Sequence, residues 1–266
     1  MFKFSVLTRL ITTATLFVYV TSCSAQREFY KLSKPTKRVE LTKELNEISG
    51  LDWIGKNTLV AVQDEKGIVF YIDANSGEIL DELNFGKDGD YEGIAQYKKH
   101  FFVLRSDGTL FKVSRKKETK TYAFKNSKGF DFEGLCVDEE NNRLLVACKE
   151  HGKSEKRDDI YIYSFSLEKN TFDKKPAFKI SRAKVHPKFK ASAIAIHPNG
   201  TIYILSSFSK TLLILSGSGE VLNVISLHKS LFNQPEGLTF NAENDLFISN
   251  EKKNDKPTLL RFNFSE

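Results

Sequence analysis

The sequence predicts an all-β protein, a five-bladed β-propeller whose ring is closed by an N-terminal strand that completes the last blade. A short cue of a polar residue, a small residue and an aliphatic residue recurs five times, mostly with a spacing near 43 residues. Each cue is followed by short apolar runs between turn residues, and almost no segment has the apolar spacing of an amphipathic helix. A repeat of this length with several short antiparallel strands is typical of one propeller blade.

The cue is expected to begin the innermost strand of each blade. It reads ISGL, YEGI, FEGL, ASAI and PEGL, with polar residues Ser49, Glu92, Glu133, Ser192 and Glu236. Successive polar residues are 43, 41, 59 and 44 positions apart. The longest step has about 16 extra residues, too few for a further blade, so we assign them to loops at residues 149–159 and 181–190.

The second and third strands of each blade are apolar runs bounded by polar residues. We expect second strands within residues 58–65, 100–107, 143–150, 201–208 and 245–252. We expect third strands within residues 67–74, 108–115, 159–166, 211–218 and 258–265. More polar fourth strands follow, as in residues 75–83 and 217–225. The fifth repeat ends at its third strand, so residues 37–45 are expected to supply the missing strand and leave no unpaired edge.

The first residues have the features of an export signal followed by a lipid attachment site. Lys3 and Arg9 precede an apolar run over residues 10–20, and Val-Thr-Ser-Cys ending at Cys23 resembles a bacterial lipobox. The alternative is an ordinary signal peptide, with an incidental cysteine or with cleavage after Ala25. The lipoprotein interpretation places the chain in the bacterial cell envelope, anchored to a membrane that we expect to be the outer one.

This interpretation divides the chain into three parts. We expect a signal peptide over residues 1–22, a tether over residues 23–35 that starts at lipidated Cys23, and a single propeller domain over residues 36–266. Loss of the signal peptide removes two basic residues, so the formal net charge of +6 becomes 6 − 2 = +4. The basic runs mix both signs and form no stripe with exposed aromatic residues, so nucleic acid is not an expected partner. We expect a monomer that is attached to the membrane through its anchor. Its expected binding partner is a small ligand or an envelope protein.

The cues and the ends of the second strands are expected to meet at one mouth of the central channel, because adjacent antiparallel strands bring these ends to the same face. Ligand-binding residues are expected there, namely Gln63, Asp64, Arg105, Lys149, Ser206 and Asn250. Further residues at the same strand ends are Ser106, Cys148, Ser207 and Glu251. The glycine of the cue allows inner strands to approach closely at the crowded axis.

Three glutamates around one channel repel one another unless something compensates their charge. Calcium takes about six to eight oxygen ligands and fits such a site. Its candidate ligands are Glu92, Glu133, Glu236, Asp90 and Asp131. Two other interpretations stay open: the carboxylates are structural staples to backbone amides of the adjacent blade, or one of them is catalytic. Arg105 is an alternative to a metal for neutralising part of the charge.

Other chemical motifs are scarce. The five histidines lack metal-ligand spacing, and no nucleophile elbow or phosphate-binding glycine loop is present. Cys136 and Cys148 fall on adjacent strands of the third blade. They are interpreted either as two separate buried thiols or as a disulfide in an oxidising compartment.

The run ISGLDW, DYEGIAQY, FEGLCVD and PEGLTF, behind an exported N-terminus, resembles the SdiA-regulated family of bacterial proteins over residues 39–264. The resemblance implies a β-propeller of the cell envelope and, more distantly, a likeness to the calcium-dependent gluconolactonase and phytase propellers. It implies no particular activity. We therefore expect an envelope-anchored binding or scaffold propeller with calcium at the channel mouth. The alternative is a calcium-dependent hydrolase of a lactone or phosphoester.

Overall fold

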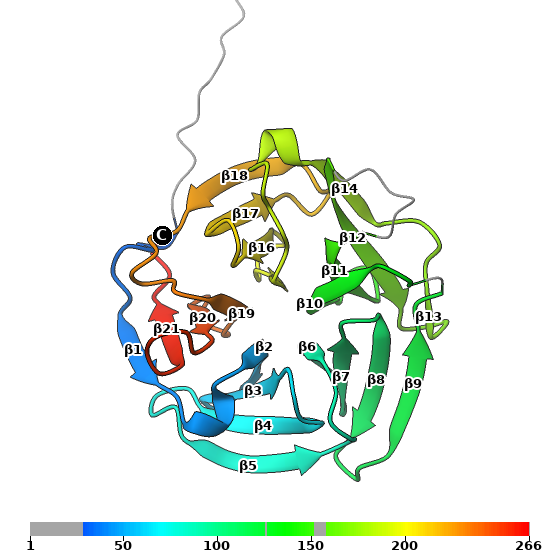
Figure 1. The fold of residues 1–266 in the computed structure, drawn as a ribbon, viewed down its shortest axis with the longest axis horizontal. Helices are drawn as coiled ribbons and strands as arrows, with labels where there is room; N and C mark the ends of the chain where they lie inside the picture. Colours follow the sequence, from blue (N-terminus) through cyan, green and yellow to red (C-terminus); the bar gives the residue numbers. More distant parts are fainter. Residues whose placement is uncertain (1–28, 126, 152–157, 266) are drawn as a thin grey trace, which may run out of the picture.

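Five small antiparallel sheets surround a central axis in the computed structural model, which describes residues 29–125, 127–151 and 158–265 (Figure 1). This confirms the predicted all-β, five-bladed propeller. The predicted signal peptide and Cys23 lie outside the described residues. Within the described ranges, no helix is long and apolar enough to cross a membrane.

Three blades have four strands that follow one another outward from the axis, as expected. The first blade consists of β2 (Ile48–Gly55), β3 (Thr58–Gln63), β4 (Ile68–Asp73) and β5 (Ile79–Asn84). The second consists of β6 (Tyr91–Tyr97), β7 (His100–Arg105), β8 (Thr109–Ser114) and β9 (Thr119–Ala123). The fourth consists of β15 (Ala193–Ile196), β16 (Ile202–Ser206), β17 (Thr211–Leu215) and β18 (Val221–Ser226).

The third blade has its outer strand in two pieces. Its strands are β10 (Asp131–Asp138), β11 (Arg143–Glu150), β12 (Asp159–Ser166), β13 (Thr171–Phe172) and β14 (Phe178–Ser181). Both β13 and β14 pair with β12, and the short 3-10 helix η2 (Arg182–Lys184) follows. The divided outer strand lies almost wholly outside residues 149–159 and 181–190, the two segments predicted as loops, and only Ser181 falls within them.

The fifth blade closes the ring as predicted. It contains β19 (Pro235–Phe240), β20 (Leu246–Asn250), β21 (Thr258–Phe262) and the N-terminal strand β1 (Lys37–Glu40). Strand β1 pairs antiparallel with β21. It is shorter than the segment we predicted, because the 3-10 helix η1 (Lys43–Leu45) follows it and turns the side chain of Leu45 into the core.

The core lies between blades. Five hydrophobic clusters each combine residues of two neighbouring sheets, for example Phe102 and Leu104 of the second blade with Phe132 and Val146 of the third. Tyr30, from the range assigned to the tether, is buried in the cluster between the fourth and fifth blades. Its hydroxyl donates to the carbonyl oxygen of Asn244 at 2.5 Å. This packing holds the start of the described chain against the fourth and fifth blades.

Candidate functional site

The recurring cue coincides with a β-bulge in four of the five inner strands. In the second blade Tyr91 pairs with Arg105 and Gly93 pairs with Leu104, so Glu92 is the extra residue. The same register shift occurs at the cues of β2, β10 and β19. A bulge bends the strand and re-aims its side chain. All five polar cue residues line one axial constriction of about 10 Å³, which has room for roughly one water molecule.

The small residue of the cue lets neighbouring inner strands touch. A Cβ atom added at Gly50 would lie 2.8 Å from Gly93 Cα in the next blade. At Gly237 it would lie 2.8 Å from Leu51 Cβ, across the junction between the last blade and the first. These contacts are too short for a real side chain, so the cue glycines are required by the packing of the ring, as the sequence predicted.

The aliphatic residue of the cue forms a buried collar around the channel. The collar consists of Leu51, Ile94, Leu135, Ile194 and Leu238. Each cue therefore supplies one polar group, one close backbone contact and one aliphatic side chain to the same ring.

The two cue serines form hydrogen bonds between neighbouring blades. Ser49 donates its hydroxyl hydrogen to the Tyr91 carbonyl oxygen at 2.5 Å, in the blade that follows. Ser192 donates in the same way to the Pro235 carbonyl oxygen at 3.1 Å. The two serines therefore connect neighbouring blades, in the way that the structural interpretation expected of the carboxylates. Their backbone partners are carbonyl oxygens, whereas that interpretation expected backbone amides.

The three cue glutamates form, with the ends of the second strands, what we call the acidic mouth. Lys149 pairs its ammonium group with Glu133, and its Nζ lies 3.8 Å from Asp131. Burial lowers the pKa of Lys149, but Glu133 and Asp131 more than reverse this and leave it raised. Burial, together with the charge of Glu236, raises the pKa of Glu133 well above its usual range despite this partner.

The remaining carboxyl groups of the acidic mouth are also hard to ionise. Burial, reinforced by Glu133 and Asp90, raises the pKa of Glu92 to about 10. Burial and the nearby Glu47 and Glu236 raise the pKa of Glu251 to about 9. Burial also raises the pKa of Glu236, although hydrogen bonds from Ser207 and Ser192 oppose this. Among the described residues, Lys149 is the lysine that pairs with a cue glutamate, and the charge of Lys210 also favours ionised Glu236 without a salt bridge. The pKa values of the carboxyl groups stay raised despite these two lysines.

Asp64 extends this acidic surface on the first blade. Its Oδ1 atom is buried without a hydrogen-bond partner among the described residues. Burial and the nearby Glu47, Glu65 and Asp90 raise its pKa to about 6. Asp90 itself accepts a hydrogen bond from the Ser106 hydroxyl. The first and second blades therefore add acids to the mouth without adding a paired cation.

Several residues that we assigned to ligand binding are engaged in holding turns. Gln63 Oε1 accepts a hydrogen bond from the Lys66 amide at 2.9 Å. Ser206 Oγ accepts one from the Lys190 amide at 3.1 Å. Asn250 Nδ2 donates to Thr258 Oγ1 at 3.0 Å. The residues one position later, among them Asp64, Lys149 and Glu251, contribute the charges of the mouth.

Arg105 does not pair with the cue glutamates and so does not neutralise their charge. Its guanidinium pairs with Asp107 at 2.8 Å and lies over the ring of Phe111. In the described part of the chain no group of three His, Cys, Asp or Glu side chains is placed to hold a metal ion. Glu133 pairs with Lys149 where we expected calcium ligands, so these side chains do not form a calcium site as they stand. Calcium binding stays a prediction.

The two described cysteines are free and buried. Cys136 pairs in register with Leu145, and Cys148 with Phe132, so they do not face one another across β10 and β11. Cys148 Sγ lies 3.6 Å from His151 Nδ1. Burial raises the thiol pKa of Cys148, whereas a reactive cysteine needs a lowered one. We interpret both as separate structural thiols.

Comparison with known proteins agrees with this repeat structure. The sequence profile of the SdiA-regulated family matches residues 28–254. The chain belongs to the SdiA-regulated family. The resemblance noted in the sequence is therefore confirmed. No curated protein shows significant sequence similarity to this family member.

Solved structures similar to this SdiA-regulated propeller are distant in sequence. Glutaminyl cyclase from Myxococcus xanthus has a TM-score of 0.64 at 14% identity, over 88% of this chain and 97% of that chain. A streptogramin B lyase has a TM-score of 0.55 at 10% identity, over 85% of this chain and 97% of that chain. A chain of a nidogen–laminin complex has a TM-score of 0.55 at 11% identity, over 82% and 76% of the two chains. At these identities the likeness shows the fold alone.

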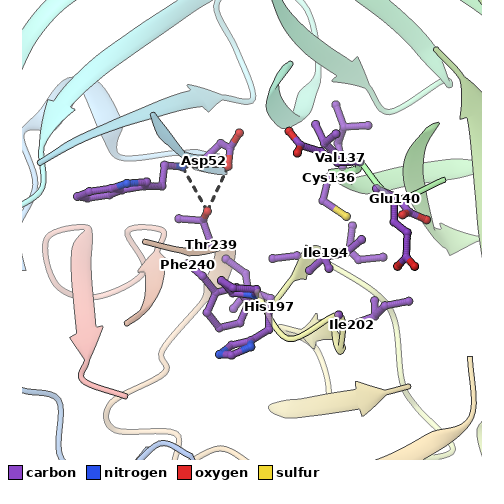
Figure 2. Close-up of a pocket in the computed structure, with 18 of the residues that line it drawn as sticks. Asp52, Cys136, Val137, Glu140, Ile194, His197, Ile202, Thr239 and Phe240 are labelled. Atoms are coloured by element: carbon purple, nitrogen blue, oxygen red, sulfur yellow. Dashed lines mark hydrogen bonds between the residues drawn. The ribbon is translucent and has the colours of Figure 1, made fainter. Parts of the chain in front are cut away.

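The opposite end of the channel holds a larger space that sequence reasoning missed. This distal cavity of about 420 Å³ is lined by the C-terminal parts of inner strands and by the turns that follow them (Figure 2). All five blades contribute, through residues such as Asp52, Gln96, Cys136, His197 and Thr239. These residues share no motif from blade to blade, so the repeat gave no signal for them.

Proposed function

We propose that this SdiA-regulated protein is a binding module of the bacterial cell envelope, anchored by a lipid on Cys23, and that its acidic mouth binds a compact cation. The observation that supports this most is the excess of buried carboxyl groups at the mouth. Glu92, Glu236 and Glu251 all have raised pKa values, and the ammonium of Lys149 is paired with Glu133.

Electrostatics gives the reason for a cation. Carboxyl groups a few ångströms apart in a buried site need either protons or a positive charge. With pKa values of about 10 and about 9, Glu92 and Glu251 hold protons at neutral pH. A cation at the mouth removes the need for these protons and favours the ionised groups. Binding is therefore expected to release protons and to become tighter as the pH rises.

The size of the ring limits what can enter it. The constriction of about 10 Å³ holds roughly one water molecule, so only a compact positive group fits between the cue residues. The ammonium head of an organic amine has the chemistry of Lys149, which already pairs with Glu133. Calcium is the other source of such a charge, and its binding requires Lys149 to move away. The hydrolase alternative gains no support, because Arg105 and Lys149 are both engaged in ion pairs.

Thermal melting tests the proposal with two probes, calcium chloride and ethylamine hydrochloride, against sodium chloride at equal ionic strength. A cation at about 100 times its dissociation constant stabilises the fold by about 2.7 kcal/mol. We expect at least one probe to raise the melting temperature, and Glu92→Gln or Glu236→Gln to reduce the increase. Glu82→Gln is the matched control, because Glu82 is exposed on β5 at the rim.

Lys149→Met removes the ammonium group that competes with either probe for Glu133. Loss of the competing ammonium should strengthen the response to calcium if the metal uses Glu133. An amine that takes the place of Lys149 should also bind more tightly. Cation binding is refuted if neither probe raises the melting temperature more than sodium chloride does, in the native protein and in Lys149→Met alike. The glutamates are then structural.

A further inference from the structure

We propose that the distal cavity is a second ligand site, which takes a small organic amine with its ammonium group beside Asp52 and its aliphatic body against the opposite wall. The cavity lies at the other end of the channel from the acidic mouth, so this proposal goes beyond the function proposed above. Its volume of about 420 Å³ falls in the range of roughly 300–1,000 Å³ that is usual for small-molecule sites.

The two sites are separated by the collar. Leu51, Leu135, Ile194 and Leu238 line both the narrow constriction and the distal cavity. A ligand in the distal cavity therefore meets the aliphatic side of the cues and does not reach the glutamates through the opening of about 10 Å³. Binding at one mouth can be measured without binding at the other.

The charge of the cavity favours a cation. Its lining includes Asp52, Asp138, Glu139 and Glu140 and, among the described residues, no lysine or arginine. This differs from the whole chain, where 40 basic residues outnumber 34 acidic ones. The charge of Asp138 is compensated by Arg143, whose Nε lies 2.7 Å from Asp138 Oδ2. The other acids leave the cavity with a negative potential.

Asp52 is the acid best placed to orient a ligand. Its Oδ2 accepts a hydrogen bond from the Gln96 amide at 2.7 Å, and its Oδ1 accepts from the Trp53 amide at 2.9 Å and the Thr239 hydroxyl at 3.2 Å. All three donors are neutral, and burial raises the pKa of Asp52 to about 6. A carboxylate has about four acceptor positions, so one remains for a ligand. An ammonium group would supply both this hydrogen bond and the missing positive charge.

The far wall of the cavity fits an apolar body. Figure 2 shows Asp52 and Thr239 on one side and an apolar patch of Cys136, Val137 and Ile194 on the other, with Glu140 beside the patch. Phe240 and Ile202 also line the cavity. A carboxylate that can orient a charged head, with an apolar patch across the same cavity, selects a molecule with a charged head and a short hydrocarbon body.

The chain contains one tryptophan, and it lines this cavity. Trp53 stacks on Phe247 with ring centroids 5.6 Å apart and is the neighbour of Asp52. Its fluorescence, excited at the red edge of tryptophan absorption, therefore reports the distal cavity and not the acidic mouth. We would titrate the full chain with hexylamine, hexanol and hexanoate. Hexylamine should give a saturable change at least about tenfold tighter than the other two, because a charged hydrogen bond contributes about that much.

Variants assign the effect to Asp52. Asp52→Asn should weaken hexylamine binding by about tenfold to a hundredfold. Glu92→Gln, at the other mouth, should leave the fluorescence titration unchanged. The proposal is wrong if hexylamine gives no saturable change, if hexanoate binds as well, or if a folded Asp52→Asn variant binds hexylamine normally.

A second measurement covers the case in which Asp52→Asn does not fold. Trp53 is partly exposed and lines the cavity. Hexylamine should therefore reduce the quenching of Trp53 fluorescence by acrylamide in the native protein, and sodium chloride at the same concentration should not. Equal quenching with and without hexylamine would overturn the proposal.

Discussion

Replacing Gly50 by alanine tests whether the cue glycines hold the ring together. The new Cβ atom would lie 2.8 Å from Gly93 Cα, 2.9 Å from Ile94 N and 3.0 Å from Gly93 C. All three atoms belong to the main chain of the neighbouring inner strand, so no rotamer change relieves the contact. Overpacking of this kind costs about 1–3 kcal/mol. The smaller conformational freedom of alanine in the unfolded chain returns about 0.4–1 kcal/mol.

The net loss is about 1–2.5 kcal/mol, because a contact with main chain falls in the upper part of the range. For a domain of this size that lowers the melting temperature by about 2–10 °C. Gly86→Ala is the matched control, since its new Cβ would meet only the Tyr91 hydroxyl at 3.3 Å. Neither glycine has a positive φ. Equal melting temperatures for the two variants, measured by calorimetry, would refute the close-approach argument.

Three other predictions concern the anchor, the closure of the ring and the acidic mouth. Cys23→Ser should move the protein from the membrane to the soluble envelope fraction, and continued membrane attachment would contradict the lipobox interpretation. Deletion of residues 36–46 removes β1 and the buried Leu41 and Leu45, so it should cost on the order of 5 kcal/mol, and an unchanged cooperative melt would exclude closure by this segment. Glu92 has a folded pKa of about 10, above its ordinary 4.5, so its contribution to stability is full below pH 4.5 and is lost as the pH rises towards 10. The melting temperature should therefore fall between about pH 7 and about pH 9, and a fall as large in Glu92→Gln would show that this carboxyl group is not responsible.

The repeat made the fold predictable from sequence. A spacing near 43 residues, four short strands and a spare N-terminal strand specify the number of blades and their closure, because unpaired edges are unfavourable. The strand boundaries near Leu45 and Phe178 were less predictable. There the chain leaves the regular repeat, and local packing decides whether it forms η1 or β14.

The sequence also predicted which residues surround the axis, but not how their charges are compensated. The bulges direct Glu92, Glu133 and Glu236 inward, as expected. Whether Arg105 or Lys149 compensates them depends on side-chain partners such as Asp107, which no periodicity reveals. The distal cavity was unpredictable for a related reason: Asp52 and Thr239 are 187 residues apart and meet only because the ring closes.

We propose that the acidic mouth built by the repeated cue exchanges protons for a cation. Such an exchange would appear as proton release when calcium chloride or ethylamine hydrochloride is added to a weakly buffered solution near pH 8. Because Glu92 and Glu251 have pKa values of about 10 and about 9, we expect a saturable release that is reduced in Glu92→Gln. A release no larger than that caused by sodium chloride, from the native protein and the variant alike, would contradict the claim.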